Sequence, residues 1–184
     1  MQITEWEVWK AIQKLNKELV AGLDEMGPLL LKELEDALAP AFTLIFKESL
    51  ESGVVPEDGG RANVTPIFKK GAKTEPGNYR LVSLTSVCCK MLESLQKSAI
   101  VSHLEANQLI NHSQHGFMAG RSCCTNLLEF MEAVTRSLGD GDPVDVIYLD
   151  FANAFDKVPK ERLLEKVLAH GVSPGIEMDQ KLAN

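Results

Sequence analysis

The first stretch of regular apolar spacing predicts a helix over residues 5–19. Its apolar residues recur every three or four positions, as on one face of an α-helix. Thr4 is followed three positions later by Glu7, the pattern of a capping box, which predicts where the helix begins. The residues of this apolar face are Val8, Ile12, Leu15 and Leu19.

A second apolar series, over residues 30–46, also has helical spacing. Pro40 interrupts it, and proline is tolerated in a helix only at a kink or in a first turn. The pattern therefore predicts two helical pieces that end near Gly53.

The middle of the chain changes to a pattern typical of strands. Residues 62–68 predict a short strand, with Pro66 at a position that an edge strand allows. Residues 79–84 predict its antiparallel mate, and the polar loop 71–78, rich in glycine and proline signals, separates the two.

Longer elements follow in the second half. Ser86 and Ser122 each stand where they could cap a long helix. Residues 144–149 are apolar at nearly every position, which predicts a central strand covered on both faces. A last helix is predicted over residues 160–170, closed by Gly171. Helices and few strands together indicate an α+β fold.

Composition narrows the class of protein. A chain of 184 residues with 45% hydrophobic content is long enough for one domain with a core. Its longest apolar stretch is about half of the ~20 residues that a bilayer span needs, and its first residues do not resemble a signal peptide. The four cysteines form two adjacent pairs without zinc spacing, so half-buried packing residues are favoured over metal or disulfide chemistry. We expect an intracellular protein of the cytoplasm or nucleus, with no membrane partner.

Charge is distributed unevenly along the chain. Residues 61–104 carry 7 Lys/Arg against 2 Asp/Glu, whereas the chain as a whole has a net charge of -7. A basic segment between acidic flanks can form a local anion site, or it can be a solvated face. Charge alone leaves both interpretations open.

The predicted strand 144–149 ends in Asp150. A carboxylate at the end of a buried strand needs a partner, and a divalent cation shared with substrate phosphates is one possibility. An aspartate that caps the following turn is the other.

Four segments, in order and in register, carry a resemblance: ANVTPIFKKG, GNYRLVSLTS, QHGFMAGRSCCTNLLEF and DFANAFDKV. Together they resemble the reverse transcriptase domain of LINE-type (non-LTR, jockey-like) retrotransposons over residues 15–172. The resemblance implies a right-hand polymerase fold with a helix-rich N-terminal part (1–60), fingers (61–143), the start of a palm (144–172) and a divergent tail (173–184).

The resemblance also implies roles around the first catalytic motif. Asp150 would be a catalytic aspartate and a ligand of two Mg²⁺ ions, with the backbone carbonyl of Phe151 as a further ligand. Phe155 would pack under the sugar of the nucleotide and exclude a 2′-hydroxyl. Asp156 would have a structural role near the following turn.

Two further groups of residues gain expected roles from the resemblance. Lys69, Lys70 and Arg80 would contact the triphosphate of the incoming deoxynucleotide. A second group would line the path of the RNA template; it consists of Gln114, Gly116, Phe117, Gly120 and Arg121. The complete protein would thus act on an RNA template, a DNA primer and deoxynucleoside triphosphates.

The chain departs from the family pattern at several positions. Glu25 stands where the family has glycine, and Gly59 stands where it has tryptophan, which predicts a loss of packing if that position is buried. The aromatic-x-Asp-Asp segment that supplies the remaining catalytic carboxylate has no counterpart in these residues. We therefore expect a truncated polymerase domain that is inactive as this chain alone. A non-catalytic remnant that binds nucleotide or nucleic acid, or an inert pseudogene product, is the alternative; a receiver-like domain phosphorylated on Asp150 fits the helical N-terminal third less well.

Overall fold

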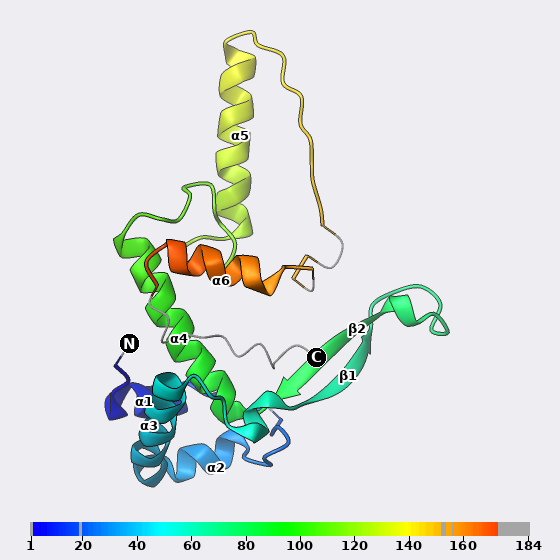
Figure 1. Cartoon of the computed structure of the whole chain (residues 1–184). Coiled ribbons are helices and arrows are strands. Elements are labelled where there is room, and N and C mark those ends of the chain that lie inside the picture. The colour runs from blue at the N-terminus through cyan, green and yellow to red at the C-terminus, as the bar shows by residue number, and fades with distance from the viewer. Residues whose placement is uncertain (1, 19, 152–153, 156, 173–184) are drawn as a thin grey trace. The chain divides into compact units, whose positions relative to one another are not determined.

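The computed structural model describes residues 2–18, 20–151, 154–155 and 157–172 (Figure 1). The chain divides into two compact units. The first comprises Met1–His103 with Leu164–Asn184, and the second is Leu104–Leu163. Among the helices of the described ranges, none is both long and apolar enough to cross a bilayer.

Helix α1 (Glu5–Gln13) begins at the predicted capping box. The Thr4 hydroxyl accepts a hydrogen bond from the backbone N–H of Glu7 at 3.3 Å, and the Glu7 carboxylate accepts one from the backbone N–H of Thr4 at 2.9 Å. The predicted end at residue 19 is wrong, because the helix stops at Gln13. The Asn16 side chain there accepts from the N–H of Glu18 at 3.0 Å, and this local turn competes with helical bonding.

The second apolar series forms two helices, as predicted. They are α2 (Pro28–Glu33) and α3 (Glu35–Ser52), and Gly53 closes α3 with a φ of 69°. The break falls at Leu34, whose φ of -110° and ψ of 18° are not helical. Pro40 lies inside α3, beyond its first turn, so the alternative of a new first turn at this residue is wrong.

The core of the first unit forms where α1 packs against α2 and α3, together with the first turns of α4 (Val87–Ala106) (Figure 1). Burial of these side chains is the main stabilising contribution to the helical part of the unit. The buried residues are Ile3, Val8, Ile12, Leu31, Ala39, Phe42, Phe46, Val87, Met91 and Leu92.

A two-stranded antiparallel sheet follows the helices, as predicted. Strand β1 (Ala62–Phe68) pairs with β2 (Tyr79–Thr85), in a register that runs from Ala62 opposite Thr85 to Phe68 opposite Tyr79. The short 3₁₀ helix η1 (Glu57–Gly60) precedes β1, and η2 (Pro76–Asn78) lies in the connecting loop.

Ser86 caps α4 as predicted and also fastens an earlier loop to this point. Its hydroxyl accepts from the N–H groups of Cys88 and Cys89 at 3.1 and 3.4 Å, and it donates to the Asp24 carboxylate at 2.6 Å. A β-carbon on Gly22 would lie 2.7 Å from the Ser86 Cα, so only glycine allows the loop to approach this closely. The junction between hairpin and helix is therefore held from two sides.

Gly59 is buried in the same unit. A β-carbon at this position would collide with the Cys89 Sγ and would lie 2.9 Å from the Val55 Cγ1. Neighbouring side chains already occupy the space that a larger residue would need. The position is buried, as the predicted packing loss required, but Cys89 and Val55 fill the space around it, and the size of the loss stays a prediction.

In the second unit, α5 (Cys123–Gly139) begins at Ser122, as predicted. The Ser122 hydroxyl accepts from the N–H of Thr125 at 3.2 Å, and the Thr125 hydroxyl accepts from the N–H of Ser122 at 2.8 Å. Helix α6 (Lys160–Ala169) also matches its prediction, and Gly171 follows it with a φ of 79°.

The predicted central strand over residues 144–149 is wrong. The segment forms neither helix nor strand, and Ile147, Tyr148 and Leu149 are 81–82% exposed. A strand exists only where a neighbour supplies its hydrogen bonds. The strands of the described ranges, β1 and β2, pair with each other and offer this segment no partner.

Candidate functional site

The cations of the hairpin are arranged by the register of its strands. Arg80 lies opposite Ile67, and the N–H of Lys69 donates to the carbonyl of Asn78 at 2.8 Å. Residues opposite each other in an antiparallel pair share a face, and so do residues two apart on one strand. Lys69 and Arg80 therefore project from the same face. Both side chains are exposed, as is Lys70 in the bend that follows.

The opposite face of the hairpin carries an aromatic pair. The rings of Phe68 and Tyr79 meet edge to face, with centroids 5.5 Å apart, and the Lys73 ammonium lies 5.8 Å from the centre of the Phe68 ring. The Tyr79 hydroxyl donates to the Lys73 carbonyl at 2.8 Å. These contacts stabilise the loop between the two strands, which carries Lys69 and Lys70 at its start.

The loop of residues 112–121 binds its own polar groups. The Gln114 amide donates to the carbonyl of Gly116 at 2.9 Å. The Arg121 guanidinium donates to the carbonyl of Gln114 at 3.0 Å and also to that of His112. Arg121 thus stabilises the loop from within, which its expected place along the template path did not indicate.

Phe117 is a large apolar residue of a kind that a loop would ordinarily bury. Its side chain is 80% exposed, and its φ of 61° lies in the left-handed region, which costs a residue with a side chain roughly 1–2 kcal/mol. Gly120, with a φ of 72°, adopts the same region without that cost. The loop therefore holds a large apolar ring outward at an energetic cost.

Phe155 lies against this ring. The two centroids are 6.1 Å apart with an interplanar angle of 85°, an edge-to-face contact, and Phe155 is itself 79% exposed. The structure thus brings together Phe117 and Phe155, which were expected to contact template and nucleotide respectively.

His115 is held between two side chains of helix α5. Its side chain is 9% exposed, and its ring nitrogens lie 2.9 Å from the Thr125 hydroxyl and 2.7 Å from the Glu129 carboxylate. The His115 hydrogen bond lowers the pKa of Glu129. Thr125 and Glu129 are four residues apart, the spacing of neighbours on a helix, and this was the available signal in the sequence.

Asp150 lies at the end of the exposed segment, and the Phe151 side chain beside it is 75% exposed. The resemblance implied that Asp150 holds two Mg²⁺ ions. Within the described ranges, no group of three or more histidine, cysteine, aspartate or glutamate side chains is placed to hold a metal ion. Asp156 lies outside the described residues. The described residues therefore do not complete a two-metal centre by themselves.

The predicted site residues fall into both units. Lys69, Lys70 and Arg80 belong to the first, while Asp150 and Phe155 belong to the second. The other members of the second unit are Gln114, Gly116, Phe117, Gly120, Arg121 and Phe151.

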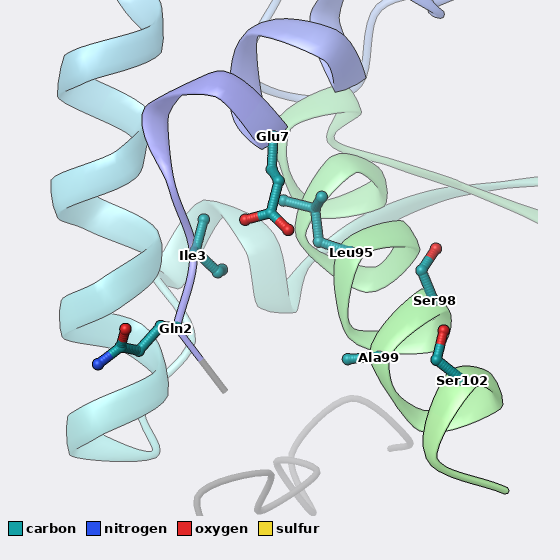
Figure 2. A pocket seen from close by; sticks show the side chains of 7 residues that line it. All are labelled: Gln2, Ile3, Glu7, Leu95, Ser98, Ala99 and Ser102. Carbon is teal, nitrogen blue, oxygen red and sulfur yellow. The ribbon is translucent and has the colours of Figure 1, made fainter. Parts of the chain in front are cut away.

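A pocket of about 190 Å³ in the first unit contains none of the predicted site residues. Figure 2 shows it between the N-terminal segment and α4, with Ile3 and Leu95 among its apolar lining and Ser98 and Ser102 along α4. The Glu7 carboxylate also lines it, but this group is already bonded within the capping box.

The cysteines differ between the two pairs. Cys88 and Cys89 are half-buried as predicted, whereas Cys123 and Cys124 are exposed, so the same prediction is wrong for the second pair. Burial raises the pKa of the Cys88 thiol to about 11, which leaves it protonated at neutral pH.

Comparison with known proteins identifies relatives of this chain. The chain is 25% identical to the "Probable RNA-directed DNA polymerase from transposon BS" of Drosophila melanogaster, over 88% of this chain and 18% of that protein. It is 28% identical to the corresponding protein of transposon X-element from the same organism, over 83% and 17%. It is 27% identical to the "RNA-directed DNA polymerase from mobile element jockey" of Drosophila funebris, over 89% and 18%.

The chain therefore spans less than a fifth of the length of these curated relatives. Residues 67–181 match the family described as "Reverse transcriptase (RNA-dependent DNA polymerase)", and this match covers more than half of the chain. The expected resemblance is confirmed: the chain belongs to the reverse transcriptase family, with relatives among the polymerases of LINE-type retrotransposons.

Proposed function

We propose that this chain contributes the fingers and the start of the palm to an RNA-directed DNA polymerase of a non-LTR retrotransposon. The complete protein would copy an RNA template into DNA from a DNA primer, using deoxynucleoside triphosphates. The observation that carries the proposal is the shared exposed face of Lys69 and Arg80 on the hairpin, within a chain of this family.

This cationic face suits a triphosphate. The guanidinium of Arg80 can form two parallel hydrogen bonds to phosphate oxygens, while Lys69 and Lys70 act as point charges. The surrounding segment has an excess of basic residues, and such a local excess attracts anions. This chemistry supports the fingers role that the family resemblance implies.

Phe155 would select the sugar. An exposed ring can pack beneath the sugar of a bound nucleotide and leave no room for a 2′-hydroxyl. This role depends on the nucleotide reaching the second unit in the complete protein.

In this proposal the complete protein, and not this chain alone, binds the catalytic Mg²⁺ ions. Asp150 and the carbonyl of Phe151 would contribute oxygen ligands, which is the ligand type that Mg²⁺ requires. The described residues do not complete a metal centre, so the remaining ligands would come from the rest of the complete protein. We expect no primer extension by the 184-residue chain with Mg²⁺, an RNA template and deoxynucleotides. Template-dependent incorporation that Asp150→Asn abolishes would refute this.

The triphosphate site is tested by nucleotide binding to the full chain, measured by titration calorimetry. Lys70→Ala and Arg80→Ala should each weaken binding by about 5-fold or more, because each removes a charged partner of a phosphate. Added salt should weaken binding to the wild-type chain. The matched control is Lys73→Ala, which removes a lysine from the same hairpin that lies over Phe68 on the other face. Equal nucleotide affinities for the wild type and both variants would show that the basic segment is only a solvated face and not a triphosphate site.

A further inference from the structure

One histidine fastens the 112–121 loop to helix α5. The His115 side chain is about nine-tenths buried, with its Nδ1 2.9 Å from the Thr125 Oγ1 and its Nε2 2.7 Å from the Glu129 Oε2. Thr125 and Glu129 are one helical turn apart, so the ring bridges consecutive turns of the helix. We call these three residues the latch.

The hydrogen atoms of the latch can be arranged in two ways. The Thr125 hydroxyl donates to the carbonyl of Ser122 at 2.8 Å, and a charged imidazole would then donate from both ring nitrogens. A neutral ring with its hydrogen on Nε2 would still donate to Glu129, and the rotated Thr125 hydroxyl would donate to Nδ1. The Glu129 bond therefore exists in both states of the ring.

Glu129 is an ionised acceptor at neutral pH. The His115 hydrogen bond is the main reason that its pKa is lowered, and the hydrogen bond from Ser113 and the charge of Arg121 act in the same direction. Carboxylates accept stronger hydrogen bonds than neutral oxygens do. The strongest hydrogen bond of the latch is therefore the one between His115 and Glu129, and Glu129 lies on the exposed side of α5.

The latch acts on a strained part of the loop. Phe117 lies two residues beyond His115, with a φ of 61° and a ring that is 80% exposed. A free loop would relax from this backbone conformation and would cover the ring. His115 fixes one side of the loop, Arg121 bonds the backbone within it, and the Phe155 ring lies edge to face against Phe117.

We propose that His115 is a positioning residue for nucleic acid: through Thr125 and Glu129 it holds the Phe117 ring outward as a stacking surface for a base of a single-stranded template. This inference rests on the proposed function. His115 is too buried to contact RNA itself, so it acts through Phe117. Exposed aromatic rings are the common platform on which single-stranded bases stack.

The test combines two measurements on the full chain. Hydrogen exchange of residues 116–121 reports on the latch, and fluorescence anisotropy with a labelled single-stranded RNA oligonucleotide reports on binding. His115→Ala should accelerate exchange in the loop and weaken RNA binding by about 5-fold or more, the loss expected for one stacked base. His112→Ala removes an exposed histidine of the same loop and should change neither the exchange rate of the loop nor the affinity for RNA.

Glu129 supplies the matched pair of variants. Glu129→Gln keeps an oxygen acceptor and should retain most of the binding, whereas Glu129→Ala should behave like His115→Ala. The double variant His115→Ala/Glu129→Ala should be no weaker than either single variant, because both remove one interaction. Circular dichroism confirms that α5 remains folded in each variant.

The outcomes separate the two levels of the proposal. Unchanged loop exchange in His115→Ala refutes the latch, and faster exchange with unchanged RNA affinity refutes its role in positioning. A wild-type chain that does not bind RNA, with Phe117→Ala indistinguishable from it, refutes the template contact in the proposed function, whatever the exchange measurement shows.

Discussion

Glu25 occupies a backbone conformation that favours glycine, so Glu25→Gly should stabilise the chain. Its φ is 55°, and its N–H donates to the carbonyl of Gly22 at 3.2 Å in the loop that leads to α2. The side chain is exposed. The family resemblance already placed a glycine at this position, and the loop has kept the glycine-type backbone although the residue has changed.

The size of the effect follows from two opposing terms. A residue with a side chain loses roughly 1–2 kcal/mol in the left-handed region, and glycine removes that cost. Glycine also makes the unfolded chain more flexible, which costs about 0.4–1 kcal/mol. The difference is a gain of about 0.5–1 kcal/mol in the free energy of unfolding.

Urea unfolding monitored by circular dichroism measures this gain. Glu25→Ala is the matched control, because it removes the carboxylate but keeps a β-carbon, and it should stay within about 0.5 kcal/mol of the wild type. Gly53→Ala imposes the reverse change at a φ of 69° and should destabilise the chain by about 1 kcal/mol. If Glu25→Gly is no more stable than Glu25→Ala, backbone strain at this loop is not the controlling term.

Three shorter predictions test packing, thiol chemistry and pH. Gly59→Ala should lower the free energy of unfolding by about 1–3 kcal/mol, since the new methyl group meets the Cys89 sulfur, and adding Cys89→Ala should restore part of the loss. Iodoacetamide near neutral pH should alkylate the exposed Cys123 well before Cys88, whose pKa burial raises to about 11; peptide mass mapping over time gives the order. The hydrogen bond from the His115 imidazole lowers the pKa of Glu129 below its ordinary value of 4.5. The latch should therefore be fully formed above pH 4.5 and should be lost as pH falls through the lowered pKa. Hydrogen exchange of the loop measures this loss.

The parts of the fold that the sequence predicted correctly depend on neighbours along the chain. Thr4 with Glu7 forms its capping box within one helical turn, and Ser122 caps α5 in the same way. The hairpin β1–β2 also joins segments that are close in sequence. Each of these elements is specified by a few adjacent residues, so a local pattern is sufficient to find it.

The parts that were missed depend on partners distant in the chain or on local competition. Residues 144–149 have the composition of a buried strand, but a strand forms only beside another, and apolar composition does not specify which segment that is. The sequence around His115 shows no partner for it, because its two partners follow ten and fourteen residues later and meet it only when the loop folds onto α5. At α1 the helical spacing continued past Gln13, but the Asn16 side chain offered the backbone a competing bond.

The two proposed binding surfaces should respond differently to salt. The hairpin presents Lys69, Lys70 and Arg80 as exposed charges in the basic segment, so nucleotide binding there would be mainly electrostatic and would fall steeply as salt rises. In the 112–121 loop the guanidinium of Arg121 already bonds backbone carbonyls, and residues 105–184 carry 7 Lys/Arg against 12 Asp/Glu. RNA held there would rely more on stacking against Phe117 and would meet fewer free cations, so its affinity should fall less steeply with salt. Affinities for a deoxynucleotide and for RNA, each measured at low and high salt, should therefore diverge; equal salt slopes would mean that both ligands bind the same cationic face.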